Sequence, residues 1–246
     1  MIPKLDEMLR TLNRHAGYIP CALLLIGAIA ISYFAHQHAT FAGDLRIYNW
    51  LQDIESPAFD VSMRTINFVG IRVLTPFAVS FCVLVLWLLR RRTEALFVGL
   101  SLVGYALTLV VKVMIDRPRP PIVETETNWM LIPGPAFPSG HVMHFVLFYG
   151  LLVYLVPFLF KGRAAQLTLQ IVLVLLIISA APAVIYAGRH WPSDALGGYV
   201  IGGLFLAALI WGYRRFPADR LDQWYERTKA GVLRLVPRRL ARRDLA

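Results

Sequence analysis

Three polar clusters interrupt an otherwise apolar chain, and each lies at an end of a long hydrophobic run. They occupy residues 112–120 (KVMIDRPRP), 138–141 (PSGH) and 188–194 (GRHWPSD). Together they offer cationic side chains, the backbone amides of a glycine-containing turn, and two histidines. A phosphoryl group in transit spreads negative charge over three oxygens, and groups of these kinds can hold those oxygens and move a proton. The clusters therefore indicate phosphoryl-transfer chemistry.

The first two clusters contain the groups that could bind phosphate. Lys112 and Arg119 are the candidate cations, with Arg117 as a further one, and arginine suits bidentate contact with phosphate oxygens. Ser139 and Gly140 stand just before an apolar run that predicts a helix, whose first N–H groups and positive dipole end favour an anion. Glycine also lets the backbone come close to a ligand. We expect these residues to hold the phosphate.

The second and third clusters contain two histidines with different expected roles. His190 and Asp194 are four residues apart, so on a helical turn they share a face and can hydrogen-bond. A carboxylate on one ring nitrogen raises the basicity of the other, which favours His190 as a nucleophile toward phosphorus. His141 follows the candidate anion-binding turn, where it could protonate a leaving group. The 49 residues from His141 to His190 correspond to two spans and a turn, which predicts that both lie on one face.

The clusters do not show the pattern of a metal site. Their carboxylates and those of the adjoining loop are few and lack metal-ligand spacing; they are Asp116, Glu124, Glu126 and Asp194. We therefore expect the cationic side chains to neutralise the phosphate in place of a metal ion. The sequence predicts no metal and no cofactor.

The elements that must position these residues are membrane spans. The chain of 246 residues is 57% hydrophobic and 16% charged, with a mean hydropathy of +0.58. A soluble domain carries about 25% charge, and runs of about 20 apolar residues indicate transmembrane helices. Six runs without Lys, Arg, Asp or Glu lie at 18–34, 73–89, 95–111, 142–160, 167–187 and 195–213. We predict an all-α fold, an integral membrane six-helix bundle.

The connections between the spans add two expectations. Residues 39–70 carry apolar residues at helical spacing, which predicts short amphipathic helices in the membrane interface, broken at Pro57. Of the 25 Lys and Arg residues, 18 lie in segment 1–16, in the turns 90–92 and 161–163, and in the tail 214–246. With six crossings these all fall on one side, which the positive-inside rule assigns to the cytoplasm. The three clusters fall on the other side.

We divide the chain into a cytoplasmic amphipathic segment (1–16), a six-span domain (17–213) and a basic cytoplasmic tail (214–246). We expect an integral membrane protein of a bacterial inner membrane, with both termini in the cytoplasm and the site on the periplasmic face. The positive-inside pattern accounts for the net charge of +10. The expected partners are therefore the lipid bilayer and a membrane lipid substrate, and no nucleic acid.

These motifs resemble those of the type 2 phosphatidic acid phosphatase family of membrane lipid phosphatases. The family pattern is Lys, six residues, Arg-Pro; then Pro-Ser-Gly-His; then Ser-Arg, five residues, His, three residues, Asp. The matching residues are Lys112, Arg119, Pro120, Pro138, Ser139, Gly140, His141, His190 and Asp194. The resemblance covers about residues 44–213 and implies a metal-independent enzyme. It implies a phosphohistidine at His190, proton donation by His141, orientation by Asp194, and phosphate held by Lys112, Arg119, Ser139 and Gly140.

One part of the third motif departs from the family pattern. Where the family has Ser-Arg, this chain has Ala183 and Val184, so one phosphate-binding cation is missing. Arg189 lies five residues later, beside His190, and is the candidate replacement. On a helix, however, a shift of five residues turns a side chain well away from the original direction. Reduced activity, another substrate, or a degenerate member without catalysis are the alternatives that this departure leaves open.

The sequence predicts a membrane lipid phosphatase that hydrolyses a lipid phosphate or pyrophosphate. By resemblance, the candidate substrates are undecaprenyl pyrophosphate, phosphatidylglycerol phosphate and phosphatidic acid. Two alternatives remain. One is a lipid phosphotransferase, in which an acceptor lipid replaces water. The other is a non-catalytic lipid-binding or transport protein, which is suggested by Val184 at the position of the motif arginine. The sequence does not predict the oligomeric state.

Overall fold

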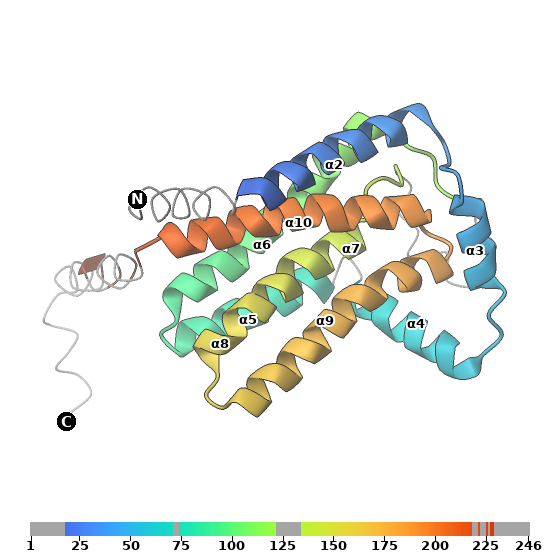
Figure 1. Ribbon diagram of the computed structural model, residues 1–246. Coiled ribbons are helices and arrows are strands. Elements are labelled where there is room, and N and C mark those ends of the chain that lie inside the picture. The colour runs from blue at the N-terminus through green and yellow to red at the C-terminus, as the bar shows by residue number, and fades with distance from the viewer. Residues whose placement is uncertain are drawn as a thin grey trace, which may run out of the picture.

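The computed structural model describes residues 18–70, 74–121 and 134–217, together with Leu221, Tyr225, Arg227 and Thr228. The predicted cytoplasmic segment, 1–16, lies outside the described residues, as does most of the predicted tail, 214–246. The described part of the chain contains helices and no strand (Figure 1). In chain order they are α2 (Tyr18–Gln37), α3 (Asp44–Gln52), α4 (Pro57–Val69), α5 (Leu74–Leu88), α6 (Arg92–Ile115), α7 (Gly140–His144), the π-helical η2 (Phe145–Tyr149), α8 (Gly150–Leu159), α9 (Arg163–Tyr186) and α10 (Pro192–Arg215).

Among the described residues, five helical runs are long and apolar enough to cross a membrane: α2, α6, the continuous run α7–η2–α8, α9 and α10. The predicted second span differs. Helix α5 has 15 residues, fewer than the roughly 20 that a bilayer requires, and it meets α4 at a bend of 64°. Counting this bent pair as one crossing gives six. The predicted all-α membrane bundle is confirmed, with five spans by length and composition, or six when α4 and α5 together count as one.

The segment between the first two spans forms two short helices, as predicted. Helix α3 ends at Gln52, and α4 starts at Pro57, whose fixed φ and missing N–H suit the first helical position. The side chain of Ser56 accepts a hydrogen bond from the Phe59 N–H (3.4 Å) and caps α4. Both helices lie at one end of the bundle, across the beginning of α10 and the end of α9 (Figure 1). The expected break at Pro57 is confirmed.

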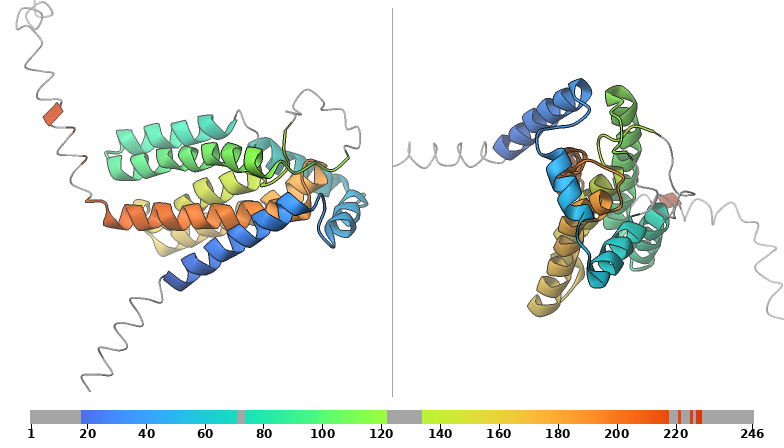
Figure 2. Two further views of the ribbon diagram at one scale, coloured as in Figure 1. Left: turned by 90° about the horizontal axis from the view of Figure 1, so that it is seen from above. Right: turned by 90° about the vertical axis from the view of Figure 1, so that its right-hand side faces the viewer.

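The run α7–η2–α8 is the centre of the bundle. Of its most apolar stretch 61% is buried, against 17–29% for the other four straight spans. It packs against α6, α9 and α10, and the antiparallel pair α5 and α6 lies on one side of it (Figure 2). Val142, Met143, Leu147 and Leu151 are all fully buried. This packing on all sides fixes the first turn of α7, which carries the second polar cluster.

Glycines bring α10 close to this central run. A Cβ at Gly198 would lie 2.9 Å from the carbonyl oxygen of Ser139, and one at Gly202 would lie 3.1 Å from Val146 Cβ. Because real Cβ atoms do not approach backbone oxygen so closely, glycine is required at 198 for the two helices to pack at this distance. The close packing joins the second and third clusters.

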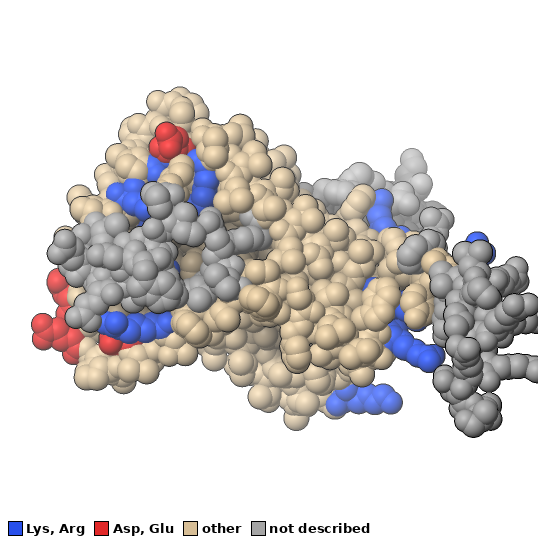
Figure 3. Space-filling model, turned by 180° about the vertical axis from the view of Figure 1, so that it is seen from behind, with Lys and Arg blue, Asp and Glu red and all other residues tan. Residues whose placement is uncertain are grey.

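Charged side chains collect at the two ends of the bundle and leave an uncharged belt between them (Figure 3). One end carries the turns at 90–92 and 161–163 and the end of α10 at 214–215. The other end carries α3, α4 and the three polar clusters (Figure 1). An apolar belt with charges above and below is the pattern of a protein that crosses a bilayer.

Candidate active site

Helix α9 ends in a tight reversal that sets the backbone of the third cluster. Gly188 has a left-handed φ of 68°, and its N–H donates to the carbonyl oxygen of Ile185 (2.9 Å). The N–H of Arg189 donates to the carbonyl oxygen of Val184 (3.2 Å). This pair of bonds is a Schellman ending, which glycine adopts without strain. The reversal places Arg189 and His190 in the short connection between α9 and α10.

Helix α10 begins in a way that brings Asp194 to His190. Trp191 is the N-cap and Pro192 the first helical residue, and Asp194 Oδ2 accepts a hydrogen bond from the Trp191 N–H (2.8 Å). The same carboxylate oxygen lies 3.6 Å from His190 Nδ1. The two residues are neighbours, but 3.6 Å is longer than the expected hydrogen bond, and His190 precedes the helix. Capping of the helix by Asp194, and not a shared helical face, brings them together.

The second cluster is hydrogen-bonded directly to the third. The backbone N–H of Ser139 donates to the carbonyl oxygen of Asp194 (3.0 Å), and Ser139 is the N-cap of α7. The Ser139 N–H, which we expected to be open to an anion, is therefore already used. Its Oγ is buried without a hydrogen-bond partner, and the helix that starts at Gly140 has first amides with no acceptor within the helix.

The two cations of the first cluster hold the loop that leads into the second. Lys112, in the last turn of α6, donates to the carbonyl oxygens of Pro135 and Ala136 (2.8 and 2.9 Å). Arg119 Nε donates to the carbonyl oxygen of Gly134 (2.9 Å). Both expected phosphate-binding cations thus lie at the edge of the PSGH turn.

Arg119 also joins the first cluster to the third. Its Nη1 donates to the carbonyl oxygen of Arg189 (2.8 Å), next to the candidate nucleophile His190. Lys112 and Arg119 therefore stand beside one site with the PSGH turn and with His190. The expected site residues thus come together from α6, the following loop, α7 and the α9–α10 connection, which are distant in the sequence.

Arg117 does not belong to this cationic group. Its side chain is fully buried and forms ion pairs with Asp194 Oδ1 (2.6 Å) and Asp44 Oδ2 (2.9 Å). The expectation that Arg117 could contact phosphate is wrong, because both of its terminal nitrogens are engaged by carboxylates behind the site. Its neighbour Arg119, two residues on, donates instead to the carbonyl oxygens of Gly134 and Arg189.

The missing motif cation and its candidate replacement lie in different surroundings. Ala183 and Val184 are each 1% exposed, and Val184 packs in an apolar cluster with Tyr48 and Trp191. Arg189 is half-buried, and its guanidinium has no hydrogen-bond or ion-pair partner among the described residues. Burial lowers the pKa of Arg189 from its usual value, which shows that solvent compensates its charge poorly. An anion beside it would be stabilised.

The surroundings of His190 keep its imidazole neutral. Burial, and to a smaller extent the charges of Lys112 and Arg119, lower the pKa of His190 to about 4, while Asp194 acts in the opposite direction. The ring is 4% exposed. At neutral pH it therefore carries a free electron pair, which a nucleophile requires.

Three buried polar atoms at this site lack a hydrogen-bond partner within the described structure: Ser139 Oγ, His141 Nε2 and His190 Nδ1. Buried polar groups are nearly always paired, so a cluster of unpaired ones indicates a place for a polar ligand. The ring of His141 is held by Gly70 at the end of α4, where a Cβ would lie 2.6 Å from His141 Cδ2. Ser139 Oγ and His141 Nε2 could therefore hydrogen-bond to a polar ligand.

The three clusters, now placed in one site, lie within a stretch that matches a known family. Residues 93–217, half of the chain, match the model of the PAP2 superfamily. The chain belongs to the PAP2 superfamily. The resemblance to the type 2 phosphatidic acid phosphatases is thereby confirmed. The matched region of this PAP2 protein begins in the first turn of α6 and ends just beyond α10.

Solved structures support the fold of this PAP2 protein. The crystal structure of a transmembrane PAP2-type phosphatidylglycerolphosphate phosphatase from Bacillus subtilis is similar, with a TM-score of 0.67 and 23% identity over 82% of this chain and 100% of that one. Aquifex aeolicus LpxE is similar with a TM-score of 0.52 and 20% identity over 69% and 94% of the two chains. No curated protein matches the sequence. At these identities the likeness establishes the fold.

Two residues of this PAP2 protein, Asp44 and Gly70, were not among the predicted site residues, although they pack behind or against the site. Asp44 accepts hydrogen bonds from Ser193 and forms the ion pair with Arg117. Gly70 packs on the imidazole of His141. Both lie in the segment before the matched region, and neither belongs to a motif. Within the described residues no group of three or more His, Cys, Asp or Glu is placed to hold a metal ion.

Proposed function

We propose that this PAP2 protein is a metal-independent phosphatase that hydrolyses a phosphate monoester or pyrophosphate on a membrane lipid. The observation that carries the proposal is that Ser139 Oγ and His141 Nε2 are buried without a hydrogen-bond partner among the described residues, in the site that also holds His190. Phosphate oxygens can satisfy the hydroxyl donor, and the two imidazoles can act on opposite sides of the phosphorus atom.

The chemistry would proceed through a phosphohistidine. The neutral His190 attacks phosphorus with Nε2, because Nδ1 faces Asp194. A nitrogen–phosphorus bond forms as the phosphorus–oxygen bond to the lipid breaks. His141, protonated in the complex with the anionic phosphate, gives its proton to the leaving oxygen. In the second half, His141 accepts a proton from water as the water oxygen attacks phosphorus. Inorganic phosphate leaves, and both histidines return to their starting states.

The cradle for the phosphate oxygens would combine side chains and backbone. Lys112, Arg119 and Arg189 supply positive charge, and Ser139 with the backbone amide of Gly140 supplies donors at a helix N-terminus. Lys112 and Arg119 donate to loop carbonyls in this structure, and phosphate would compete for those donors. Anionic phosphate is the stronger acceptor for these cations, because a carbonyl oxygen carries only a partial charge and phosphate adds the attraction of opposite full charges.

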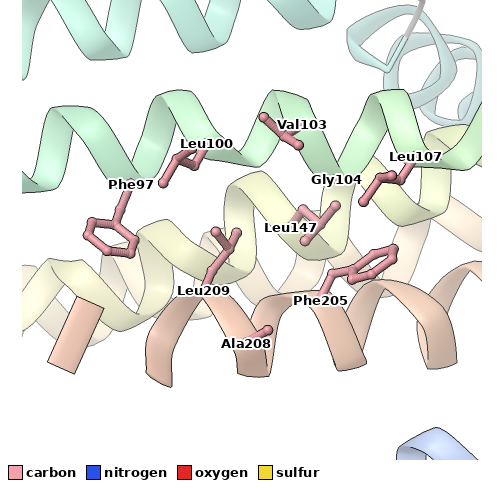
Figure 4. A pocket seen from close by; sticks show the side chains of 9 residues that line it. All are labelled: Phe97, Leu100, Val103, Gly104, Leu107, Leu147, Phe205, Ala208 and Leu209. Atoms are coloured by element: carbon pink, nitrogen blue, oxygen red, sulfur yellow. The ribbon is translucent and has the colours of Figure 1, made fainter. Parts of the chain in front are cut away.

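An apolar cavity beneath the site favours a lipid substrate. Its volume is about 310 Å³, and side chains from α6, η2 and α10 point into it (Figure 4). Leu107 on its wall lies five residues before Lys112, which is roughly 7 Å deeper along α6. Val103 and Leu107 are 54% and 40% exposed, so the cavity opens toward the bilayer. A lipid tail could enter it while the phosphate stays at the end of the bundle.

We place this protein in a bacterial inner membrane, and the charge distribution supports an orientation with the site on the periplasmic face and both termini in the cytoplasm. The exposed basic turns between α5 and α6 and between α8 and α9 lie at the end of the bundle opposite to the α9–α10 connection, which carries His190 (Figure 1). Cytoplasmic loops carry the excess of Lys and Arg in membrane proteins. Tagging the C-terminus and testing its accessibility in intact cells would check this orientation.

Phosphate release by the purified protein in detergent, with a chelator present, tests the proposed function. We expect release from phosphatidic acid, phosphatidylglycerol phosphate or undecaprenyl pyrophosphate, unaffected by chelation and abolished by His190→Gln. The matched control is His36→Gln, at an exposed histidine at the end of α2. Equal release from His190→Gln and wild type would contradict the proposal. Phosphorylation of an added acceptor lipid, in place of free phosphate, would indicate a phosphotransferase.

A non-catalytic lipid-binding protein is the second candidate, favoured by one observation. Val184 replaces the motif arginine and is buried among apolar side chains, where no cation could be accommodated. Binding of a lipid phosphate without release of phosphate over the whole substrate panel would select this alternative. A folded protein whose His190→Gln variant binds the same lipids equally well would support it further.

A further inference from the structure

The carboxylate beside the candidate nucleophile is connected on its far side to a buried cation. Arg117 Nη1 donates to Asp194 Oδ1 (2.6 Å), and Nη2 donates to Asp44 Oδ2 (2.9 Å). The side chains of Arg117 and Asp194 are 0% exposed, and that of Asp44 is 3% exposed. One guanidinium thus bridges two carboxylates out of contact with water, one from α3 and one from α10.

Further hydrogen bonds fix this bridge to the backbone. Asp44 Oδ1 accepts from the Ser193 N–H (2.9 Å), and Oδ2 accepts from the Ser193 hydroxyl (2.6 Å). Arg117 Nε donates to the carbonyl oxygens of His38 and Ala39 (3.2 and 3.1 Å). The loop before α3, the first turn of α10 and the loop after α6 are therefore joined at a single buried point.

The second carboxylate gives the cluster of Asp44, Arg117 and Asp194 an excess of negative formal charge. Arg117 contributes one positive charge and the two aspartates one negative charge each, so the cluster carries one net negative charge. With Arg117 and Asp194 alone the pair would be neutral. An imidazole that forms a bond to phosphorus gains positive charge, and a nearby negative charge in a buried site stabilises that change more than it would in water.

Asp194 is the source of negative charge that faces this imidazole. The other charged or titratable groups around His190 are Lys112 and Arg119, from α6 and the loop after it, and His141 and Arg189, from α7 and the α9–α10 connection. Of these groups Asp194 alone is an anion. Any loss of its effective charge to Arg117 would leave His190 in cationic surroundings.

We propose that Asp44 is a positioning and charge-balancing residue for the phosphatase reaction: by pairing with Arg117, it preserves the negative charge that Asp194 presents to His190. This inference rests on the proposed function, since it requires His190 to be the nucleophile. Asp44 touches no reacting atom and acts through Arg117 and Ser193. It lies in α3, before the region 93–217 that matches the family.

Charge variants of the full-length protein in detergent micelles test the inference. The substrate is short-chain phosphatidic acid, and kcat and KM are measured separately. Asp44→Asn makes the cluster neutral, so kcat should fall about tenfold with KM little changed. Asp44→Asn with Arg117→Gln leaves Asp194 alone and restores one net negative charge. We expect the double variant to recover most of the lost kcat.

Two more variants separate charge from geometry. Arg117→Gln alone leaves a second uncompensated anion near His190, so the acid limb of kcat/KM should move to higher pH. Ser193→Ala removes hydroxyl contacts of the same cluster without changing its charge, and the acid limb should stay in place. A structural role alone would give no shift in either variant.

The outcomes divide clearly. Unchanged kcat in Asp44→Asn, or a double variant slower than the single one, overturns the inference. If Asp44→Asn does not fold, the double variant decides: a folded and active protein supports charge balance, and an inactive or unfolded one overturns it. A wild-type protein that releases no phosphate would instead remove the proposed function, which separates the two failures.

Discussion

The backbone N–H of Ser139 donates a hydrogen bond to the carbonyl oxygen of Asp194 (3.0 Å). This bond joins the turn that precedes His141 to the helix start that follows His190. The two imidazoles are thereby set relative to each other by main-chain geometry, which is stiffer than a side-chain contact. Gly198, one helical turn beyond Asp194, permits the approach because it has no Cβ to meet Ser139.

Substitution of Gly198 should therefore damage the site more than the fold. In Gly198→Ala the new Cβ would lie 2.9 Å from both the Ser139 carbonyl oxygen and Val142 Cβ, which forces α10 away from the PSGH turn. We expect kcat to fall by about 10²-fold, as for a displacement of about 1 Å in a catalytic group. Gly203→Ala is the matched control, since the nearest atom to its Cβ would be 3.7 Å away. Equal kcat values for the two variants would argue against this coupling.

Arg189 should supply the phosphate-binding charge that the motif lacks. Because its guanidinium has no partner among the described residues, Arg189→Ala should leave folding intact and reduce kcat/KM by about 10²–10³-fold, as for loss of one transition-state donor. Arg189→Lys should retain part of the activity. Arg46→Ala, at an exposed position on α3, is the control. Undiminished phosphate release from Arg189→Ala would assign Arg189 to structure.

The neutral state of His190 predicts a dependence of stability on pH. Its pKa is lowered to about 4 by burial, from an ordinary value near 6.5. As pH falls from about 6.5 to 4, the unfolded chain takes up a proton that the folded protein does not. The free energy of unfolding should therefore fall by about 3 kcal/mol over this range. Above about pH 6.5, where His190 is neutral in both the folded and the unfolded state, its titration should cause no loss of stability.

Thermal unfolding in detergent between pH 4 and 7 measures this effect. The unfolding midpoint of the wild type should fall on acidification more steeply than that of His190→Gln, which lacks the titrating group. Parallel curves would mean that His190 is not held neutral. In kinetics, the acid limb that belongs to His190 should appear near pH 4 in kcat/KM, because protonation removes the electron pair of the nucleophile.

The apolar cavity predicts selectivity for lipid tails. Ala208→Phe fills part of it, so kcat/KM for a long-chain phosphatidic acid should fall about tenfold relative to a short-chain one. A tenfold change corresponds to about 1.4 kcal/mol, which is the free energy of leaving about two methylene groups of the lipid tail unburied. Ala106→Phe makes the same change at an exposed position of α6 outside the cavity lining. The same ratio in both variants would show that the cavity does not hold the tail.

The sequence alone predicted the candidate site residues and the span pattern. Apolar runs of bilayer length have few folding alternatives in a membrane, and the spacing of Lys112, Arg119, His141 and His190 relative to those runs placed all four at one end of the bundle. The break at Pro57 followed from the fixed φ of proline. These are local properties, which neighbouring residues decide.

The tertiary structure decided what lies behind the site. Arg117 and Arg119 are two residues apart in one basic motif, yet Arg117 is buried between Asp44 and Asp194 while Arg119 lies beside His190. No periodicity distinguishes them, because the difference depends on which carboxylate meets each guanidinium after folding. Asp44 and Gly70 gained their contacts in the same way, through packing of α3 and α4 against segments far along the chain. Local spacing decides on which side of its helix or loop a side chain lies. The carboxylate or the free volume that the side chain meets there is contributed by residues far away in the sequence.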